Sequence, residues 1–224
     1  MQSSLRPFVL PLVVYMAGAT LASAFDRWYP LAYSFTTLAT LIACVWLLKG
    51  RGIIRPHLNV ATGVLVGGLG IVVWIWVSGL HLEDSLFQFL PRFLRPDARV
   101  GYNPFFELDS ATARWVFIAI RLVGISVAVP IAEELFWRGF LLRWFINEEF
   151  EKVPLGTYSL QSLALVTLFF TLAHPELFAA AFYNLLITGL LYWKRDLWQC
   201  IVAHAVSNFL LVVYVLQYKA WWLW

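Results

Sequence analysis

The chain contains repeated apolar runs, most of them about as long as a helix must be to cross a bilayer. Such a helix needs roughly 20 predominantly apolar residues. Seven runs reach or approach this length: 7–25, 29–48, 58–80, 112–130, 157–173, 177–193 and 197–218. Because lipid offers no hydrogen-bond partners to an open backbone, these runs predict helices. The expected fold class is all-α, a polytopic transmembrane bundle of seven to eight membrane helices.

Whether the helices number seven or eight depends on Pro130, since the segment 131–147 continues the fourth run. Proline removes one helical hydrogen bond and its ring clashes with the preceding turn. The segment is expected to be either the far half of one bent helix or a separate membrane-embedded helix.

Composition agrees with a membrane location. The chain is 61% hydrophobic and only 13% charged, whereas soluble domains are about 45–50% apolar and about 25% charged. The net charge of +3 is scattered along the chain, so the expected surroundings are the lipid bilayer and a nucleic-acid partner is not expected. The sequence gives no indication of oligomeric state.

Basic residues in short connections indicate orientation. Lys49, Arg51 and Arg55 occupy one connection, and Lys194 and Arg195 occupy another. Cytoplasmic loops are enriched in lysine and arginine, so both connections are expected in the cytoplasm, with the C-terminus outside if the spans number seven. The protein is expected to be a multi-pass protein of the bacterial inner (plasma) membrane.

One apolar stretch, "VAVPIAEELFWRGFLLRWF" at 127–145, holds Glu133, Glu134 and Arg138. Each charge near the bilayer centre costs about 2.5–3.5 kcal/mol, so the cluster must pair internally or reach water. Glu134 and Arg138 are four residues apart on one helical face, with the acid first, which is the favourable order. Glu133 lies about 100° around the helix, which leaves it the freer carboxylate and a candidate general base.

Two other apolar segments carry polar groups at helical spacing. "FFTLAHPEL" places Phe170 and His174 four residues apart, and "CIVAHAVSNF" does the same for His204 and Asn208. Taken singly, each is commonly a hydrogen-bonding residue between membrane helices. Two glutamates, an arginine, two histidines and an asparagine on three segments together favour a shared functional site.

These residues resemble the three-motif signature EExxxR, FxxxH, HxxxN of the CPBP family of intramembrane glutamic endopeptidases. That family includes the type II CAAX prenyl endopeptidases and the Abi-type proteins. The resemblance covers roughly residues 110–215. It implies a catalytic helical core at 111–218, preceded by membrane helices and an external loop at 1–110, within one integrated membrane domain.

The resemblance also implies a role for each position. Glu133 and His174 would polarise a water that attacks the peptide carbonyl, and His204 and Asn208 would donate to the oxyanion. Glu134, paired with Arg138, would brace the site. The implied partner is a membrane-anchored peptide or protein substrate, a prenylated CAAX-type tail among the candidates, and no cofactor is implied.

Several residues near these motifs lie outside the signature. Pro175 should end or redirect the helix at His174, and Glu176 is expected in the following loop. Asn184 and Arg121 also lie in apolar segments and could line a cavity or counter a carboxylate. The motif does not explain Arg121.

Other interpretations remain open at this stage. Glutamate with two histidines could bind zinc in a membrane metalloprotease, although the chain has no H-E-x-x-H spacing. Cys200 is four residues from His204, but a cysteine in an apolar helix is usually unreactive. A transporter is disfavoured because no inverted repeat is evident. A non-catalytic Abi-type scaffold or immunity-like binding protein is the remaining alternative.

Overall fold

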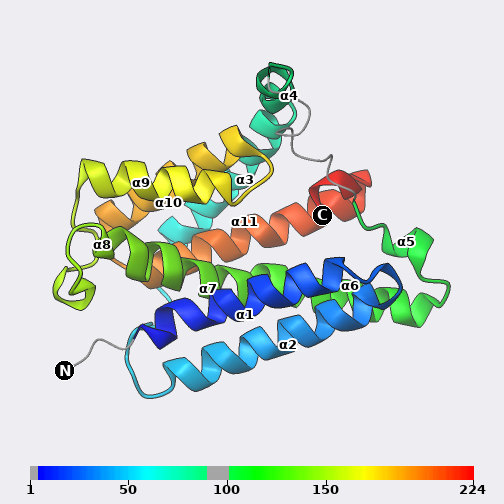
Figure 1. Ribbon diagram of the computed structural model, residues 1–224, viewed down its shortest axis with the longest axis horizontal. Helices are drawn as coiled ribbons and strands as arrows, with labels where there is room; N and C mark the ends of the chain where they lie inside the picture. Colours follow the sequence, from blue (N-terminus) through cyan, green and yellow to red (C-terminus); the bar gives the residue numbers. More distant parts are fainter. Residues whose placement is uncertain (1–4, 90–100) are drawn as a thin grey trace.

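The computed structural model describes residues 5–89 and 101–224. Every regular element in these ranges is helical. The longer helices run roughly along one axis, and α1 begins and α11 ends at opposite ends of the bundle (Figure 1). The α-helices are α1 Arg6–Ser23, α2 Tyr29–Leu48, α3 Ala61–Ser78, α4 Leu82–Phe87, α5 Pro104–Glu107, α6 Ala111–Val123, α7 Val129–Glu134, α8 Leu142–Trp144, α9 Leu160–Leu172, α10 Leu177–Lys194 and α11 Leu197–Tyr218. Short 3₁₀ turns are η1 Asp26–Trp28, η5 Phe150–Lys152 and η6 Trp221–Leu223.

The predicted all-α membrane bundle is confirmed. In the described ranges, six helical segments are long and apolar enough to cross a membrane. The seventh expected span, 157–173, is the shorter α9, which has 13 residues. Ser159 caps its start by accepting from the Ser162 amide, and the chain leaves the helix before Pro175, as expected. At 1.5 Å per residue, α9 is about 20 Å long, shorter than the roughly 30 Å hydrocarbon layer.

Pro130 does not divide the fourth span into two helices. It lies within one unbroken helical segment of 34 residues, Ala111–Trp144. Two π-helical stretches interrupt its α-helical geometry, η3 at Gly124–Ala128 and η4 at Leu135–Leu141. Pro130 lies in the first turn of α7, directly after η3. The segment 131–147 is therefore the continuation of the fourth span and no separate helix, with its last residues beyond Trp144 outside the helix.

The helices pack in two groups on either side of this long segment. Helices α1 and α2 pack against each other, and α1 also contacts α7 and η4. On the other side, α3 packs against α10 and α11, while α10 contacts α9. The long segment and α11 lie between these groups (Figure 1), so the interior of the bundle lies beside α7 and α11.

Glycines allow α3 to approach α11 closely. A Cβ at Gly63 would meet the Gln199 backbone oxygen, and one at Gly67 would meet that of Ala203. The Gly63 amide also donates to the Gln199 side chain at 2.8 Å. Small residues four apart are a frequent means of close packing between membrane helices, and here they set the position of α11.

The connection 81–111 carries two short helices, α4 and α5; residues 90–100, including Arg92, Arg95 and Arg99, lie outside the described ranges. Glu83 in α4 accepts a hydrogen bond from the Phe178 amide at the start of α10, at 3.0 Å. A carboxylate is favourable at a helix N-terminus, so this contact fixes α4 beside the loop that joins α9 to α10.

Candidate active site

Glu134 and Arg138 form a fully buried ion pair, as the spacing predicts. Both side chains have no exposed surface, and Arg138 Nη1 donates to Glu134 Oε1 at 3.0 Å. Removing either partner of a buried pair leaves an uncompensated charge. The pair therefore belongs to the structural centre of the bundle.

The pair continues into a network that joins four helical segments. His204 on α11 donates from Nδ1 to the same Glu134 oxygen at 2.8 Å. Arg138 Nη2 donates to Asn184 Oδ1 on α10 at 2.8 Å, and the Asn184 amide donates to Thr167 on α9 at 2.9 Å. The sequence pointed to Asn184 as a residue that lines the cavity or counters a carboxylate, but it serves as a partner of the arginine.

His174 lies just beyond the C-terminal end of α9. Its Nδ1 is 2.7 Å from the Phe170 backbone oxygen, which can only accept, so Nδ1 carries the proton. Nε2 is then the nitrogen left for chemistry. The Phe170 ring stacks on the imidazole with centroids 4.3 Å apart, and Trp74 of α3 meets it edge-on at 5.9 Å. These contacts hold the ring in one orientation.

Asn208 is tied to the π-helical stretch before the glutamates. In η3, the Val129 amide bonds to the Gly124 oxygen, five residues back. In the same register the next donor, residue 130, would serve Ile125, but proline has no N–H. Asn208 Nδ2 donates to the Ile125 oxygen instead, at 2.9 Å. The asparagine thus satisfies a carbonyl that Pro130 leaves free, and one amide hydrogen remains.

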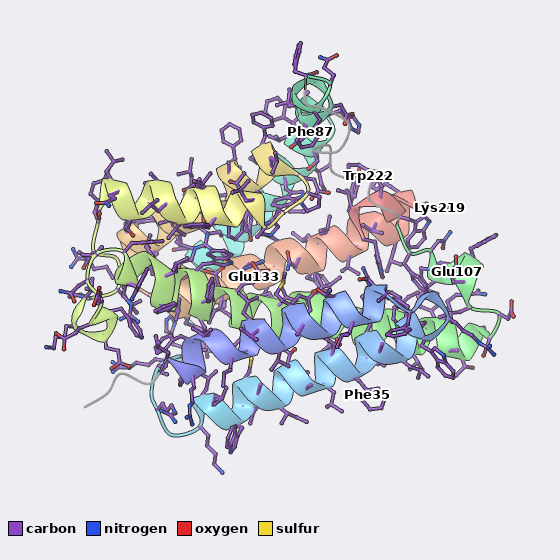
Figure 2. All side chains as sticks on the ribbon, viewed as in Figure 1. Phe35, Phe87, Glu107, Glu133, Lys219 and Trp222 are labelled. Carbon is purple, nitrogen blue, oxygen red and sulfur yellow. The ribbon has the colours of Figure 1, made fainter. Side chains whose placement is uncertain are left out.

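Glu133 faces a partly enclosed cavity of about 180 Å³. Figure 2 shows its side chain in the interior of the bundle, where α7 runs beside α11. One of its oxygens, Oε2, is buried and has no hydrogen-bond partner among the described residues. His174, His204 and Asn208 line the same cavity.

The six predicted site residues therefore fall into two sets. Glu133, His174, His204 and Asn208 line the cavity, whereas Glu134 and Arg138 lie behind it. His204 joins the sets because its Nδ1 holds Glu134 while its ring reaches the cavity. The arrangement offers a free carboxylate, two imidazoles and an amide around one polar space.

Further cavity residues carried little or no signal in the sequence. The cavity wall also contains aromatic and charged side chains from α1, α2, α3, α6, α10 and the C-terminus, among them Tyr15, Tyr33, Trp74, Arg121, Tyr183 and Trp224. Aromatic residues are frequent in membrane helices, so their types alone did not mark them. Arg121 was expected to line a cavity or counter a carboxylate, and it lines the cavity. Glu176 precedes α10 and lines the cavity, so it belongs to both the loop and the cavity wall.

The cysteine interpretation is not supported. Cys200 is fully buried, and its thiol lies near the backbone oxygens of Ile187 and Asp196, at 3.8 and 3.5 Å. It is not among the residues of the cavity wall. His57 and His81 lie at exposed positions outside the cavity wall, and His57 is bonded to Asp196.

The zinc interpretation lacks a ligand set in the described ranges. There, no three histidine, cysteine, aspartate or glutamate side chains are grouped so as to hold a metal ion. The nearest candidate, Glu134 with His204, is already joined by a hydrogen bond and by the Arg138 pair. Independence from metal stays a prediction.

Comparison with protein families identifies this helical region. Residues 115–210 match the family described as type II CAAX prenyl endopeptidase Rce1-like. This part of the chain resembles the Rce1-like family. The match covers the long helix from α6 onward, the α9–α10 pair and most of α11, and therefore contains all six predicted site residues. Residues 1–114 lie outside it.

This resemblance and the apolar helices of the described ranges support two statements. The chain is an integral multi-pass membrane protein, and at the level of the family it is a CAAX-type intramembrane peptidase. No curated protein and no solved structure matches the chain.

Proposed function

We propose that this Rce1-like protein is an intramembrane endopeptidase in which Glu133 and His174 activate a water molecule against a peptide bond. The observation that carries the proposal is the meeting of Glu133, His174, His204 and Asn208, from three helical regions, in the wall of one cavity. Placing four polar side chains together inside an apolar bundle is costly, and hydrolysis supplies a reason for the arrangement.

The general base is assigned to Glu133, because Glu134 is committed to Arg138 and His204. His174 presents Nε2 as a proton acceptor, since its Nδ1 is engaged by the Phe170 carbonyl. Together they take a proton from water as its oxygen bonds to the scissile carbonyl carbon. When the C–N bond breaks, the same proton passes to the leaving amine, so the two residues end in their starting state.

His204 and Asn208 are assigned as the hydrogen-bond donors that stabilise the oxyanion formed during attack. Asn208 has one amide hydrogen left after its bond to Ile125. His204 holds Glu134 through Nδ1, and it donates from Nε2 when that nitrogen is also protonated. Fixed donors aimed at developing charge commonly contribute about 2.7–4 kcal/mol each to lowering the barrier. Glu134 and Arg138 act as positioning residues for His204.

The proposed substrate is a peptide anchored in the membrane, with a prenylated C-terminal tail as the first candidate from the family. The bilayer presents the apolar anchor, while the polar cavity brings water to the bond. The proposed location is a bacterial inner (plasma) membrane, and the proposed mechanism uses no metal or other cofactor.

The test is cleavage of a farnesylated, internally quenched peptide by the purified chain in liposomes. Glu133→Gln and His174→Ala are each expected to lower kcat by at least about 100-fold. Glu148→Gln, the same exchange at an exposed position after the long helix, is expected to match the wild type. Equal activity in Glu133→Gln and wild type overturns the assignment. Loss of activity in a chelator with recovery in zinc overturns metal independence.

A further inference from the structure

A second pocket lies between the start of α1 and the end of α2, which meet at one end of the bundle (Figure 1). The pocket has a volume of about 410 Å³ and is lined by Arg6, Leu10, Trp46, Leu47, Lys49 and Arg51. None of these residues lines the cavity of Glu133. This α1–α2 pocket is therefore a separate space, and its volume is within the roughly 300–1,000 Å³ of sites that hold small molecules.

Apolar side chains form one part of the α1–α2 pocket. Leu10 comes from α1, and Trp46 and Leu47 come from the last turn of α2. Trp46 is 75% exposed, so on a membrane helix its ring meets lipid. Tryptophan is enriched at the level of the lipid headgroups. The pocket is thus placed where the headgroup of a phospholipid and the first part of its acyl chain lie.

Cationic side chains form the rest of the pocket wall. Arg6 begins α1, whereas Lys49 and Arg51 follow α2, so the charges come from both helices. None of the three side chains has an ion-pair or hydrogen-bond partner among residues 5–89 and 101–224. No acidic side chain is among the described residues of the wall. Like charges around one space repel one another, and a bound anion would offset that repulsion.

The first turn of α1 adds further donors for an anion. Leu5 precedes the helix without a side-chain cap, and the first turn contains no acidic residue. The leading amides of a helix lack partners within the helix, and together with the helix dipole they favour phosphate. Arg6 is both the first residue of this helix and part of the pocket wall. The free amides therefore lie beside the cationic part of the pocket.

We propose that the α1–α2 pocket binds an anionic phospholipid, with its phosphate at the three cations and an acyl chain along the apolar side chains. A lipid uses the whole wall, whereas a soluble phosphate would gain nothing from the apolar part. Basic pockets between membrane helices on the cytoplasmic side bind anionic headgroups, and this end of the bundle carries the basic connections expected in the cytoplasm. The inference does not depend on the proposed function.

Such a lipid would join the start of α1 to the end of α2. Helix α1 also contacts α7 and η4, and Phe8, two residues after Arg6, packs edge-on against Phe150 with ring centroids 5.1 Å apart. Holding the start of α1 would therefore stabilise its position beside the long helical segment. A ligand that binds only the folded chain raises its stability.

The first test is photocrosslinking in nanodiscs, whose two faces are both accessible, so that the orientation of the chain does not affect the result. The purified chain is placed in phosphatidylcholine with a minor fraction of photoreactive phosphatidylglycerol, or with the same fraction of photoreactive phosphatidylcholine. Phosphatidylglycerol is expected to label Leu10, Trp46 and Leu47 at least about tenfold more than phosphatidylcholine does. Equal labelling by the two lipids, or labelling only at other positions, overturns the proposal.

Removing two of the cations should weaken the binding. Each cation near an anionic headgroup contributes about fivefold in affinity, so Lys49→Gln/Arg51→Gln is expected to lower the labelling by phosphatidylglycerol about 10- to 30-fold. Lys49→Arg/Arg51→Lys keeps both charges and is expected to keep the labelling. Both positions are exposed, so neither double variant disturbs the core. Undiminished labelling of Lys49→Gln/Arg51→Gln overturns the proposal.

The matched control is Lys194→Gln/Arg195→Gln. It removes one lysine and one arginine from the α10–α11 connection, which lies at the same end of the bundle (Figure 1) but outside the α1–α2 pocket. Labelling of Leu10 in this variant is expected to match the wild type. An equal loss in both glutamine variants would show attraction by the general surface charge and would overturn the site.

Thermal unfolding gives a readout that is independent of crosslinking and of peptide cleavage. Phosphatidylglycerol in the nanodisc is expected to raise the Tm of the wild type and of Lys194→Gln/Arg195→Gln above the value in phosphatidylcholine. The rise should be much smaller for Lys49→Gln/Arg51→Gln. Equal rises in all three chains contradict the proposal.

Inorganic phosphate separates a lipid headgroup from a soluble phosphate. At an ionic strength held constant with chloride, added phosphate is expected to leave the labelling by phosphatidylglycerol unchanged, because it cannot use the apolar part of the wall. Loss of labelling in phosphate would assign the pocket to a soluble phosphate compound and overturn the lipid proposal.

Discussion

At the scale of single residues, two adjacent glutamates have different surroundings. Glu134 has no exposed surface and accepts from both Arg138 and His204, whereas Glu133 faces the cavity with one oxygen unpartnered among the described residues. The one-residue step around the helix, about 100°, produces this difference. Glu134 therefore contributes to the stability of the bundle, whereas Glu133 is free for the proposed chemistry.

Substitutions at these residues should separate stability from activity. Arg138→Ala leaves Glu134 charged in the core and is expected to lower the free energy of unfolding by about 3–5 kcal/mol. Glu133→Gln breaks no described hydrogen bond and should change it by less than about 1 kcal/mol. Denaturant unfolding in detergent measures both. Equal destabilisation by the two variants would contradict the division.

The sequence predicted part of this arrangement. The Glu134–Arg138 pair follows from helical spacing, and the end of α9 before His174 follows from Pro175. The bond between His204 and Glu134 joins positions 70 residues apart, so it depends on how the helices pack. No local pattern in the sequence predicts how α11 packs against the long helical segment.

At the scale of elements, the π-helical stretch η3 couples the long helix to α11. Pro130 withholds the N–H that the π register would direct to Ile125, and Asn208 supplies the donor. The proline was visible in the sequence, but the expected outcome was a bend or a break in the helix. A π register depends on the whole packed segment, so the partner of Asn208 could not be predicted.

A double substitution tests whether Asn208 is more than this structural donor. Asn208→Ala leaves the Ile125 carbonyl unpaired, at a cost of about 1–3 kcal/mol, and should abolish cleavage. Adding Pro130→Ala returns a backbone N–H and is expected to recover stability without recovering activity. Thermal unfolding measures the stability of each variant, and the liposome assay measures its activity. Recovery of both would reduce Asn208 to a structural role.

The packing of α3 on α11 gives a second prediction at this scale. Gly67→Ala places a methyl group against the Ala203 backbone oxygen, which should cost about 1–3 kcal/mol and move α11 with His204. Gly68→Ala is the matched control, because nothing lies within 4 Å of its added carbon; it should be neutral or stabilising by up to about 1 kcal/mol. Unfolding measurements that rank the two variants in reverse would contradict this packing.

At the scale of the whole molecule, the start of α1 and the end of α11 lie at opposite ends of the bundle (Figure 1). The start of α1, the α2–α3 connection and the α10–α11 connection share one end, while α5 and the end of α11 lie at the other (Figure 1). The basic connections at 49–55 and 194–195 therefore lie together, as the charge pattern requires. Six long spans and the shorter α9 reproduce the seven expected segments.

This topology can be measured by labelling single cysteines in a background in which Cys44 and Cys200 are serine. Leu58 is 99% exposed beside the basic end, and Phe106 is 82% exposed in α5. A membrane-impermeant maleimide should label Phe106→Cys in intact cells and Leu58→Cys only after permeabilisation. Labelling of both, or of neither, in intact cells would contradict the proposed orientation.

The most direct measurement of the central claim is a comparison of uncut substrates in native membranes. Peptides from cells that carry the wild type, Glu133→Gln or Glu148→Gln would be compared by mass spectrometry. If Glu133 is the general base, membrane-anchored peptides should accumulate at full length only with Glu133→Gln and be trimmed in the other two strains. Identical peptide sets in all three strains would contradict hydrolysis by this carboxylate.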